Sequence, residues 1–144
     1  MAVRAFICGL AGTEIGPEEG AFLRQADPFG LIVFRRNVDN PEQLAALSAS
    51  FRDIIGRDAP ILVDQEGGRV QRLGPPHWPA YPPGAAFAAL YEVDRQAGLE
   101  AIRLGARLIA HDLRKVGIDV TRRRDPRTRD RINTIRRLPE VGDQ

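Results

Sequence analysis

The sequence predicts an α/β protein built on a parallel sheet. Short apolar segments alternate along the chain with segments whose apolar residues recur at the three- and four-residue spacing of a helix. The apolar segment at residues 30–34 has no polar alternation, which is typical of a strand buried on both faces. The order strand, helix, strand, helix, strand, loop, helix, strand opens both a (β/α)8 barrel and a doubly wound sheet. No glycine-rich dinucleotide or phosphate loop follows a strand, which argues against the commonest doubly wound functions.

The first half of the chain is predicted to hold two strands and two helices. Residues 3–10 are mostly apolar and predict a buried strand, and Pro17 with the two acidic residues after it predicts a helix to about residue 26. The strand at 30–34 follows. The second helix should begin at the N-cap Asn40 and end at Gly56. Its apolar residues share one face: Leu44, Leu47, Phe51 and Ile55.

The second half begins with a strand over residues 60–63 that ends in Asp64. Residues 67–84 are rich in glycine and proline and predict a long loop. A third helix is predicted over about residues 91–116, closed by Gly117, and a fourth strand begins with residues 118–120. The apolar stripe of that helix consists of Ile102, Gly105, Ile109, Leu113 and Val116.

Length and composition limit the class of protein. The 144 residues suffice for one domain, and 43% of them are apolar. The single cysteine, Cys8, excludes an internal disulfide, and we find neither a secretory signal nor a membrane span, so a cytoplasmic protein is expected. The net charge of +2 hides an uneven distribution, because eight arginines fall within residues 121–137 while residues 1–120 are mildly acidic.

Residues 64–73 (DQEGGRVQRL) carry the chemistry that the sequence suggests. They begin where an apolar strand ends, which is where parallel α/β proteins build their sites. The Asp64 carboxylate could accept hydrogen bonds from two sugar hydroxyls, and Gly67 and Gly68 permit close approach of the backbone. Arg72 could donate two parallel hydrogen bonds to a polar ligand. An alternative remains open, in which these charges form a network that only closes the mouth of the fold.

This segment resembles the hallmark of family 3 β-N-acetylhexosaminidases among the glycoside hydrolases. Three further segments match in the expected order: 30–37 (GLIVFRRN), 40–44 (NPEQL) and 117–120 (GIDV). The resemblance covers about residues 1–120 and implies the N-terminal part of an incomplete (β/α)8 barrel. It implies that Asp64 and Arg72 bind the substrate, with Glu66 and Arg69 in supporting roles. It also implies a carbohydrate substrate, terminal N-acetylglucosamine on muropeptides from peptidoglycan recycling, with no cofactor and no metal.

The pattern breaks after Val120. The family continues with a Lys-His-x-Pro-Gly-His-Gly motif and a later catalytic Asp, and neither is present here. The lone lysine, Lys115, and the two histidines, His77 and His111, match no catalytic position, so surface or packing roles are expected for the histidines. Asp64 and Glu66 are a tempting carboxylate pair, but Gly67 and the glycine after it suggest that the strand has ended. The resemblance therefore implies a truncated enzyme with no catalytic residue in this chain, inactive alone.

The chain is thus expected to divide into a partial barrel domain at 1–120 and a non-homologous, arginine-rich tail at 121–144 that is expected to be disordered. A shifted reading frame explains the abrupt change better than a basic arm or a solvated tail, because the change falls inside a strand. The alternative function is a polyanion- or nucleic-acid-binding module that uses the tail, although the leading interpretation includes neither nucleic acid nor membrane among the partners. A third possibility is a half-barrel that associates with a second chain. The first and fourth strands are expected to keep open edges, which favours aggregation or dependence on a partner.

Overall fold

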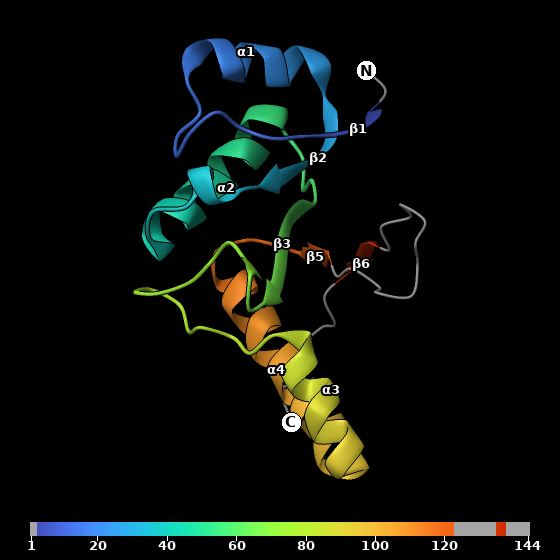
Figure 1. Ribbon diagram of the computed structural model, residues 1–144. Coiled ribbons are helices and arrows are strands. Elements are labelled where there is room, and N and C mark those ends of the chain that lie inside the picture. The colour runs from blue at the N-terminus through green and yellow to red at the C-terminus, as the bar shows by residue number, and fades with distance from the viewer. Residues whose placement is uncertain (1–2, 123–134, 138–144) are drawn as a thin grey trace.

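The computed structural model describes residues 3–122 and 135–137; residues 1–2, 123–134 and 138–144 lie outside the described part. It is an α/β structure, as the sequence predicts (Figure 1). The strands are β1 (Arg4–Cys8), β2 (Pro28–Val33), β3 (Ile61–Gly67), β4 (Val70–Gln71), β5 (Val120–Arg122) and β6 (Ile135–Arg137). The helices are α1 (Pro17–Ala26), α2 (Pro41–Ile55), α3 (Gly84–Val93) and α4 (Arg95–Lys115), with a 3-10 turn, η1 (Arg35–Asn37).

The strand order distinguishes the two architectures that the sequence leaves open, a (β/α)8 barrel and a doubly wound sheet. β1, β2, β3 and β5 are parallel neighbours in the same order as in the chain. A doubly wound sheet reverses its strand order at a switch point and carries helices on both faces. Here the order never reverses, and α1, α2 and α4 all contribute to one core. The described residues therefore have the succession with which a (β/α)8 barrel begins.

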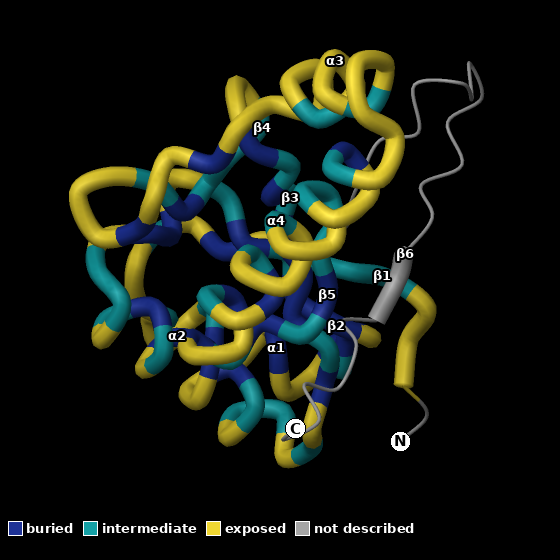
Figure 2. Tube along the Cα trace, turned by 90° about the horizontal axis from the view of Figure 1, so that it is seen from below, coloured by how far each residue is buried: buried dark blue, intermediate teal, exposed yellow. Residues whose placement is uncertain are grey.

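The core lies between the sheet and these three helices. The helix-facing strand residues are Leu31, Val33, Ile61 and Val63, all at most 1% exposed. The buried helix residues are Leu23 from α1, Leu44, Leu47 and Phe51 from α2, and Ala110 and Leu113 from α4. Figure 2 shows buried residues gathered along the strands and the inner faces of these helices, whereas α3 is mostly exposed.

Local signals set the ends of α2 as predicted. The side chain of Asn40 accepts a hydrogen bond from the backbone N–H of Gln43 at 2.8 Å, and Pro41 occupies the first helical position. At the other end Gly56 adopts a φ of 69°, which a residue with a side chain rarely does. Gly117 closes α4 in the same left-handed conformation, with a φ of 77°.

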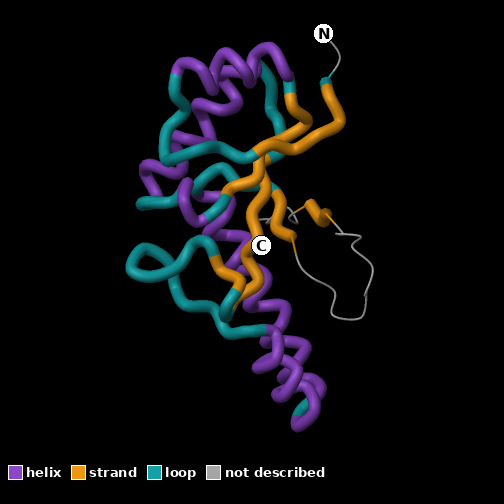
Figure 3. The backbone as a smooth tube through the Cα atoms, turned by 45° about the horizontal axis from the view of Figure 1, so that its top comes forward, coloured by secondary structure: helices purple, strands orange, loops and turns teal. Residues whose placement is uncertain are grey.

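The predicted third helix is wrong in one respect, because two helices occupy its place. The Asp94 carboxylate accepts a hydrogen bond from the backbone N–H of Ala97 at 3.0 Å and so begins α4. α3 covers residues 84–93, of which residue 84 was expected to end the loop, residues 85–90 were left undetermined and residues 91–93 were expected to begin the third helix. The two helices pack closely, since a Cβ on Gly98 would lie 2.7 Å from that of Tyr91. Together they form a hairpin that extends away from the sheet (Figures 1 and 3).

Three strand predictions also need correction. β1 is only half-buried, with Arg4 and Ala5 exposed, because it lies at the edge of the sheet. β3 does not end at Asp64 but continues to Gly67 and turns back into β4, so the predicted loop begins with a hairpin. The fourth strand, β5, was expected to keep an open edge; it pairs with β6 in antiparallel register, so two stretches of residues 121–144 lie in the sheet. The remainder of the predicted tail lies outside the described residues.

Candidate functional site at the carboxyl end of β3

A tight hairpin at the end of β3 places the predicted site residues. Gly67 and Gly68 have φ angles of 83° and 59°, in the left-handed region that glycine adopts without strain. A Cβ on Gly68 would also lie 2.7 Å from the Cβ of Pro83. The chain then returns as β4, with Gln71 opposite Gln65. Both glycines are therefore required by the turn and by the segment that packs against it.

The hairpin brings Arg72 back to Asp64. Nη2 of Arg72 lies 3.3 Å from Oδ2 of Asp64, and the two side chains are 30% and 18% exposed. The Nε atom of Arg72 is buried and has no hydrogen-bond partner among the described residues. A buried donor without an acceptor costs free energy. The Asp64 carboxylate and the partly exposed Arg72 guanidinium offer acceptors and donors to a ligand that carries hydroxyl or carbonyl oxygens, whereas the buried Nε is out of its reach.

Two glutamine side chains hold the segment that follows, residues 72–83, which we call the strap. Gln65 is 4% exposed, and its Oε1 accepts from the backbone N–H groups of Arg72 at 2.8 Å and Leu73 at 3.1 Å. Its Nε2 donates to the Leu73 carbonyl at 2.8 Å. Gln71 donates to the carbonyls of Leu73 and Pro79 and accepts from the N–H of Tyr81. Both glutamines replace the backbone partners that this irregular segment lacks.

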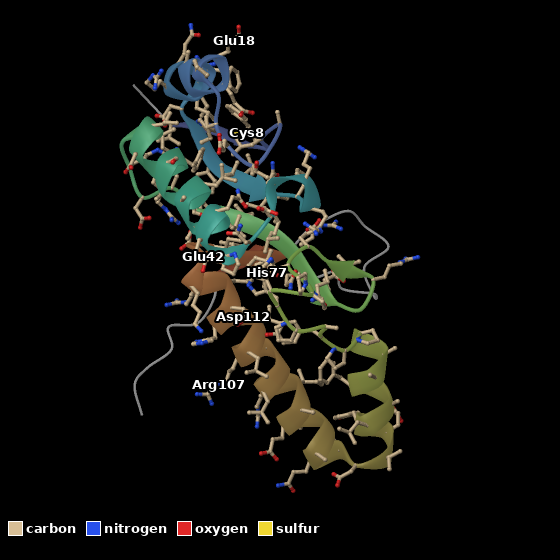
Figure 4. All side chains as sticks on the ribbon, turned by 90° about the vertical axis from the view of Figure 1, so that its left-hand side faces the viewer. Cys8, Glu18, Glu42, His77, Arg107 and Asp112 are labelled. Carbon is tan, nitrogen blue, oxygen red and sulfur yellow. The ribbon has the colours of Figure 1, made fainter. Side chains whose placement is uncertain are left out.

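The far end of the strap is attached to α4 and to the hairpin turn. The Tyr81 hydroxyl donates to Oδ2 of Asp112 at 2.6 Å, and the Tyr81 carbonyl accepts from the N–H of Gly68 at 2.8 Å. Burial, together with the hydrogen bond to the Asp112 carboxylate, raises the pKa of Tyr81 well above its usual range. The neutral phenol is therefore strongly favoured in the folded chain. Figure 4 labels Asp112 on α4 and His77 in the strap.

The end of β2 forms the other side of the site. Asn37 is buried and bridges strand ends: its amide donates to the carbonyls of Leu10 and Gly12, and its Oδ1 accepts from the N–H of Phe34. A small hollow of about 10 Å3, room for about one water molecule, lies between this end and the strap. Its lining residues are Arg35, Val38, Asp39, Arg72, Gly74, Pro75, Pro76, His77 and Trp78.

The other candidates are placed as follows. Glu66 alternates along β3 with the buried Gln65, so it lies on the same face as Asp64, and both are half-buried. The sequence left this relation undetermined because the strand was expected to end earlier. Arg69 is exposed in the turn. His77 and His111 are exposed, which agrees with the surface role considered for them.

Among the described residues, no group of three or more histidine, cysteine, aspartate or glutamate side chains could hold a metal ion. Within the same part of the chain, no helix has the length and apolar character needed to cross a membrane.

Gln65, Gln71 and Tyr81 were not predicted from the sequence. Each acts mainly through hydrogen bonds to backbone groups or to one distant side chain, and such contacts leave no pattern in the sequence. One signal in the sequence could have found Gln65. Because side chains alternate between the two faces of a strand, the residue after Asp64 is expected to point into the core. A buried glutamine needs several hydrogen-bond partners, and the neighbouring irregular segment supplies them.

Comparison with known proteins connects this geometry to one family, although no family model matches the chain. A β-hexosaminidase of Xanthomonas axonopodis pv. citri is 39% identical over 115 residues, which are 80% of this chain and 34% of that protein. The structure of NagZ from Neisseria gonorrhoeae in complex with N-trifluoroacetyl-D-glucosamine superposes with a TM-score of 0.72 and 30% identity, over 81% of this chain and 35% of NagZ. A glycoside hydrolase family 3 β-N-acetylglucosaminidase from Paenibacillus sp. str. FPU-7 gives a TM-score of 0.70 and 29% identity over 81% of this chain and 22% of that enzyme.

Sequence and fold agree, since about four-fifths of the chain is matched in both comparisons. The chain spans about one third of the length of the curated relatives that it matches. The polyanion-binding alternative gains no support from these relatives, which are hexosaminidases. By sequence and by fold, this chain is thus a homologue of one part of the β-hexosaminidases of glycoside hydrolase family 3.

Proposed function

We propose that this chain forms the sugar-binding part of a β-N-acetylhexosaminidase, and that Asp64 and Arg72 bind the hydroxyls of a terminal N-acetylglucosamine. The observation that carries the proposal is the Asp64–Arg72 pair at the carboxyl end of β3, whose side chains are 18% and 30% exposed. Carboxylate acceptors beside partly exposed guanidinium donors suit a sugar, whose hydroxyls both donate and accept. The N-acetylglucosamine analogue bound to the related NagZ gives independent support for this ligand class.

The natural substrate that we propose is a muropeptide, within cytoplasmic recycling of peptidoglycan. Glu66 would support Asp64 from the same face of β3, while Arg69 would act from the turn. Residues 1–120 would form the family domain. The carboxylate acceptors and guanidinium donors of the site suit the hydroxyls of a carbohydrate, which supports this proposal.

A titration with N-acetylglucosamine, followed by two-dimensional NMR, tests this function. Binding should perturb amide signals of the hairpin and strap, and Asp64→Ala or Arg72→Ala should weaken it by about tenfold or more, the effect of losing a charged hydrogen bond. Arg107→Ala is the matched control, because Arg107 lies on the outer face of α4, away from the site (Figure 4). Equal binding by all three variants would place the sugar elsewhere.

The 144 residues should bind without turnover. A retaining glycosidase needs a nucleophile and an acid/base group. The family resemblance gives neither role to Asp64 or Glu66, and the Lys-His-x-Pro-Gly-His-Gly motif is absent from the 144 residues. Incubation of pure protein with an aryl N-acetyl-β-glucosaminide should therefore release no phenol. Turnover that disappears in Asp64→Ala would show that this carboxylate does chemistry rather than binding alone.

A further inference from the structure

Gln65 contacts the backbone of Arg72 rather than any surface that a sugar could reach. It is 4% exposed and lies on the opposite face of β3 from Asp64. Its Oε1 accepts from two consecutive N–H groups, those of Arg72 and Leu73, and its Nε2 donates to the Leu73 carbonyl. One side chain thereby fixes both the position and the direction of the backbone from which the Arg72 side chain extends.

This contact matters because the Asp64–Arg72 pair has little else to hold it. A single distance of 3.3 Å joins the two side chains, and the buried Nε of Arg72 has no partner among the described residues. An arginine side chain has many rotamers, so its guanidinium can stay beside Asp64 only if its backbone is held. Gln65 and Asp64 are adjacent on one rigid strand, which makes β3 the common reference for both members of the pair.

We propose that Gln65 is a positioning residue that sets Arg72 against Asp64 for binding of an N-acetylglucosamine-type sugar. This inference rests on the function proposed above. Gln65 itself touches no ligand; it acts through the backbone of Arg72. Small displacements of a binding group cost large factors in affinity or rate, which gives a buried amide remote from the ligand a measurable effect.

Gln71 supplies a matched control within the same strap. It also donates to the Leu73 carbonyl, and it holds Pro79 and Tyr81, but no hydrogen bond described for it joins it to the backbone of Arg72. Gln71→Leu and Gln65→Leu therefore both remove hydrogen bonds to the strap. Only Gln65→Leu also removes the hydrogen bond to the backbone N–H of Arg72. Gln65→Glu is the conservative variant, because a protonated carboxyl group has an acceptor for the two N–H groups and a donor for the Leu73 carbonyl.

The experiment records the Nε–Hε signal of Arg72 by NMR in the 144-residue chain and titrates each variant with N-acetylglucosamine. Gln65→Leu should shift or broaden that signal and weaken binding about tenfold or more, whereas Gln71→Leu should leave the signal in place and change affinity by about twofold at most. Gln65→Glu should restore most of the affinity. In an Arg72→Ala background, Gln65→Leu should cause no further loss.

Two results would overturn the inference. One is an unchanged Arg72 Nε–Hε signal in folded Gln65→Leu. The other is an equal loss of sugar affinity in Gln65→Leu and Gln71→Leu. Either result would mean that Gln65 has only a structural role. Should Gln65→Leu fail to fold, Gln65→Met, which has a similar shape but neither the acceptor nor the donor of the amide, replaces it in the comparison with Gln71→Leu and is judged by the same two readouts. If the unmodified chain binds no sugar, the proposed function fails, and the Arg72 signal still tests the positioning.

Discussion

The two ends of the parallel sheet each carry an arginine–aspartate pair, and the pairs are built differently. At the amino end, Arg52 of α2 lies 2.7 Å from Asp119 and also donates to the carbonyls of Ala59 and Gly117. The Asp119 carboxylate in turn accepts from the N–H of Ile61 at 3.1 Å. At the carboxyl end, Arg72 has one contact of 3.3 Å with Asp64 and a buried Nε without a partner among the described residues.

The difference agrees with the roles proposed for the two pairs, stability for Arg52–Asp119 and sugar binding for Asp64–Arg72. Nε and Nη2 of Arg52 both find acceptors, so this side chain joins α2 to the segments that precede β3 and β5. Arg72 makes a single contact with Asp64 and its side chain is 30% exposed, so a ligand oxygen can still accept a hydrogen bond from its guanidinium. This division matches the general organisation of barrels, with stability at the amino end of the strands and sites at the carboxyl end.

Removal of Arg52 should give the largest effect on stability. Arg52→Leu deletes four polar contacts and leaves the Asp119 carboxylate half-buried without its cation, so the free energy of unfolding should fall by about 2–3 kcal/mol. Urea denaturation measures the loss. Arg107→Leu, on the outer face of α4, is the control and should change it by about 0.5 kcal/mol at most. Equal effects would remove the distinction between the two ends.

Removal of Arg72 should give the opposite profile. Arg72→Leu deletes one long contact of a partly exposed pair, so the free energy of unfolding should change by about 1 kcal/mol or less. The same variant should lose about tenfold or more in affinity for N-acetylglucosamine. Denaturation and titration of the same sample give both numbers. A loss of stability as large as that of Arg52→Leu would instead support the network that only closes the mouth of the fold.

The smallest effect concerns Tyr81, which joins the strap to α4. Its pKa is raised by burial and by the Asp112 carboxylate, so its neutral form stabilises the fold fully below the unfolded pKa of about 10. As the pH rises past that value, the unfolded chain loses its proton first, and stability falls. Between about pH 9 and 11, the free energy of unfolding should therefore fall more steeply with pH in the unaltered chain than in Tyr81→Phe. At pH 7, Tyr81→Phe should be about 1 kcal/mol less stable than the unaltered chain. Parallel curves would show that the phenol does not contribute in this way.

Local signals explain how much of the fold could be predicted. The boundaries of α2 follow from Asn40 and Gly56, whose roles depend on residues only a few positions away. The split between α3 and α4 was missed because Asp94 interrupts a continuous apolar pattern with a single cap. β3 was predicted too short because Gly67 was interpreted as the start of a loop, when it forms the hairpin turn.

The candidate site shows the same limit. Asp64 and Arg72 were predicted from charge, glycine spacing and family resemblance, and the structure brings them within 3.3 Å; their role in sugar binding stays a prediction. Gln65 and Gln71 could not be found, because their partners are carbonyl and N–H groups that nearly every residue possesses. Side chains that act on the backbone become visible only when the path of the chain is known.

The two ion pairs also differ in how far the chain must travel to form them. Eight positions separate Asp64 from Arg72, whereas 67 separate Arg52 from Asp119. A short loop closes at small entropic cost, and contacts between near neighbours form early in folding. The carboxyl-end pair can therefore assemble as soon as the β3–β4 hairpin does, while the amino-end pair must wait for α4 to return the chain to the sheet. The proposed sugar site is therefore encoded in a segment of about ten residues, whereas the amino-end pair depends on contacts made across most of the described chain.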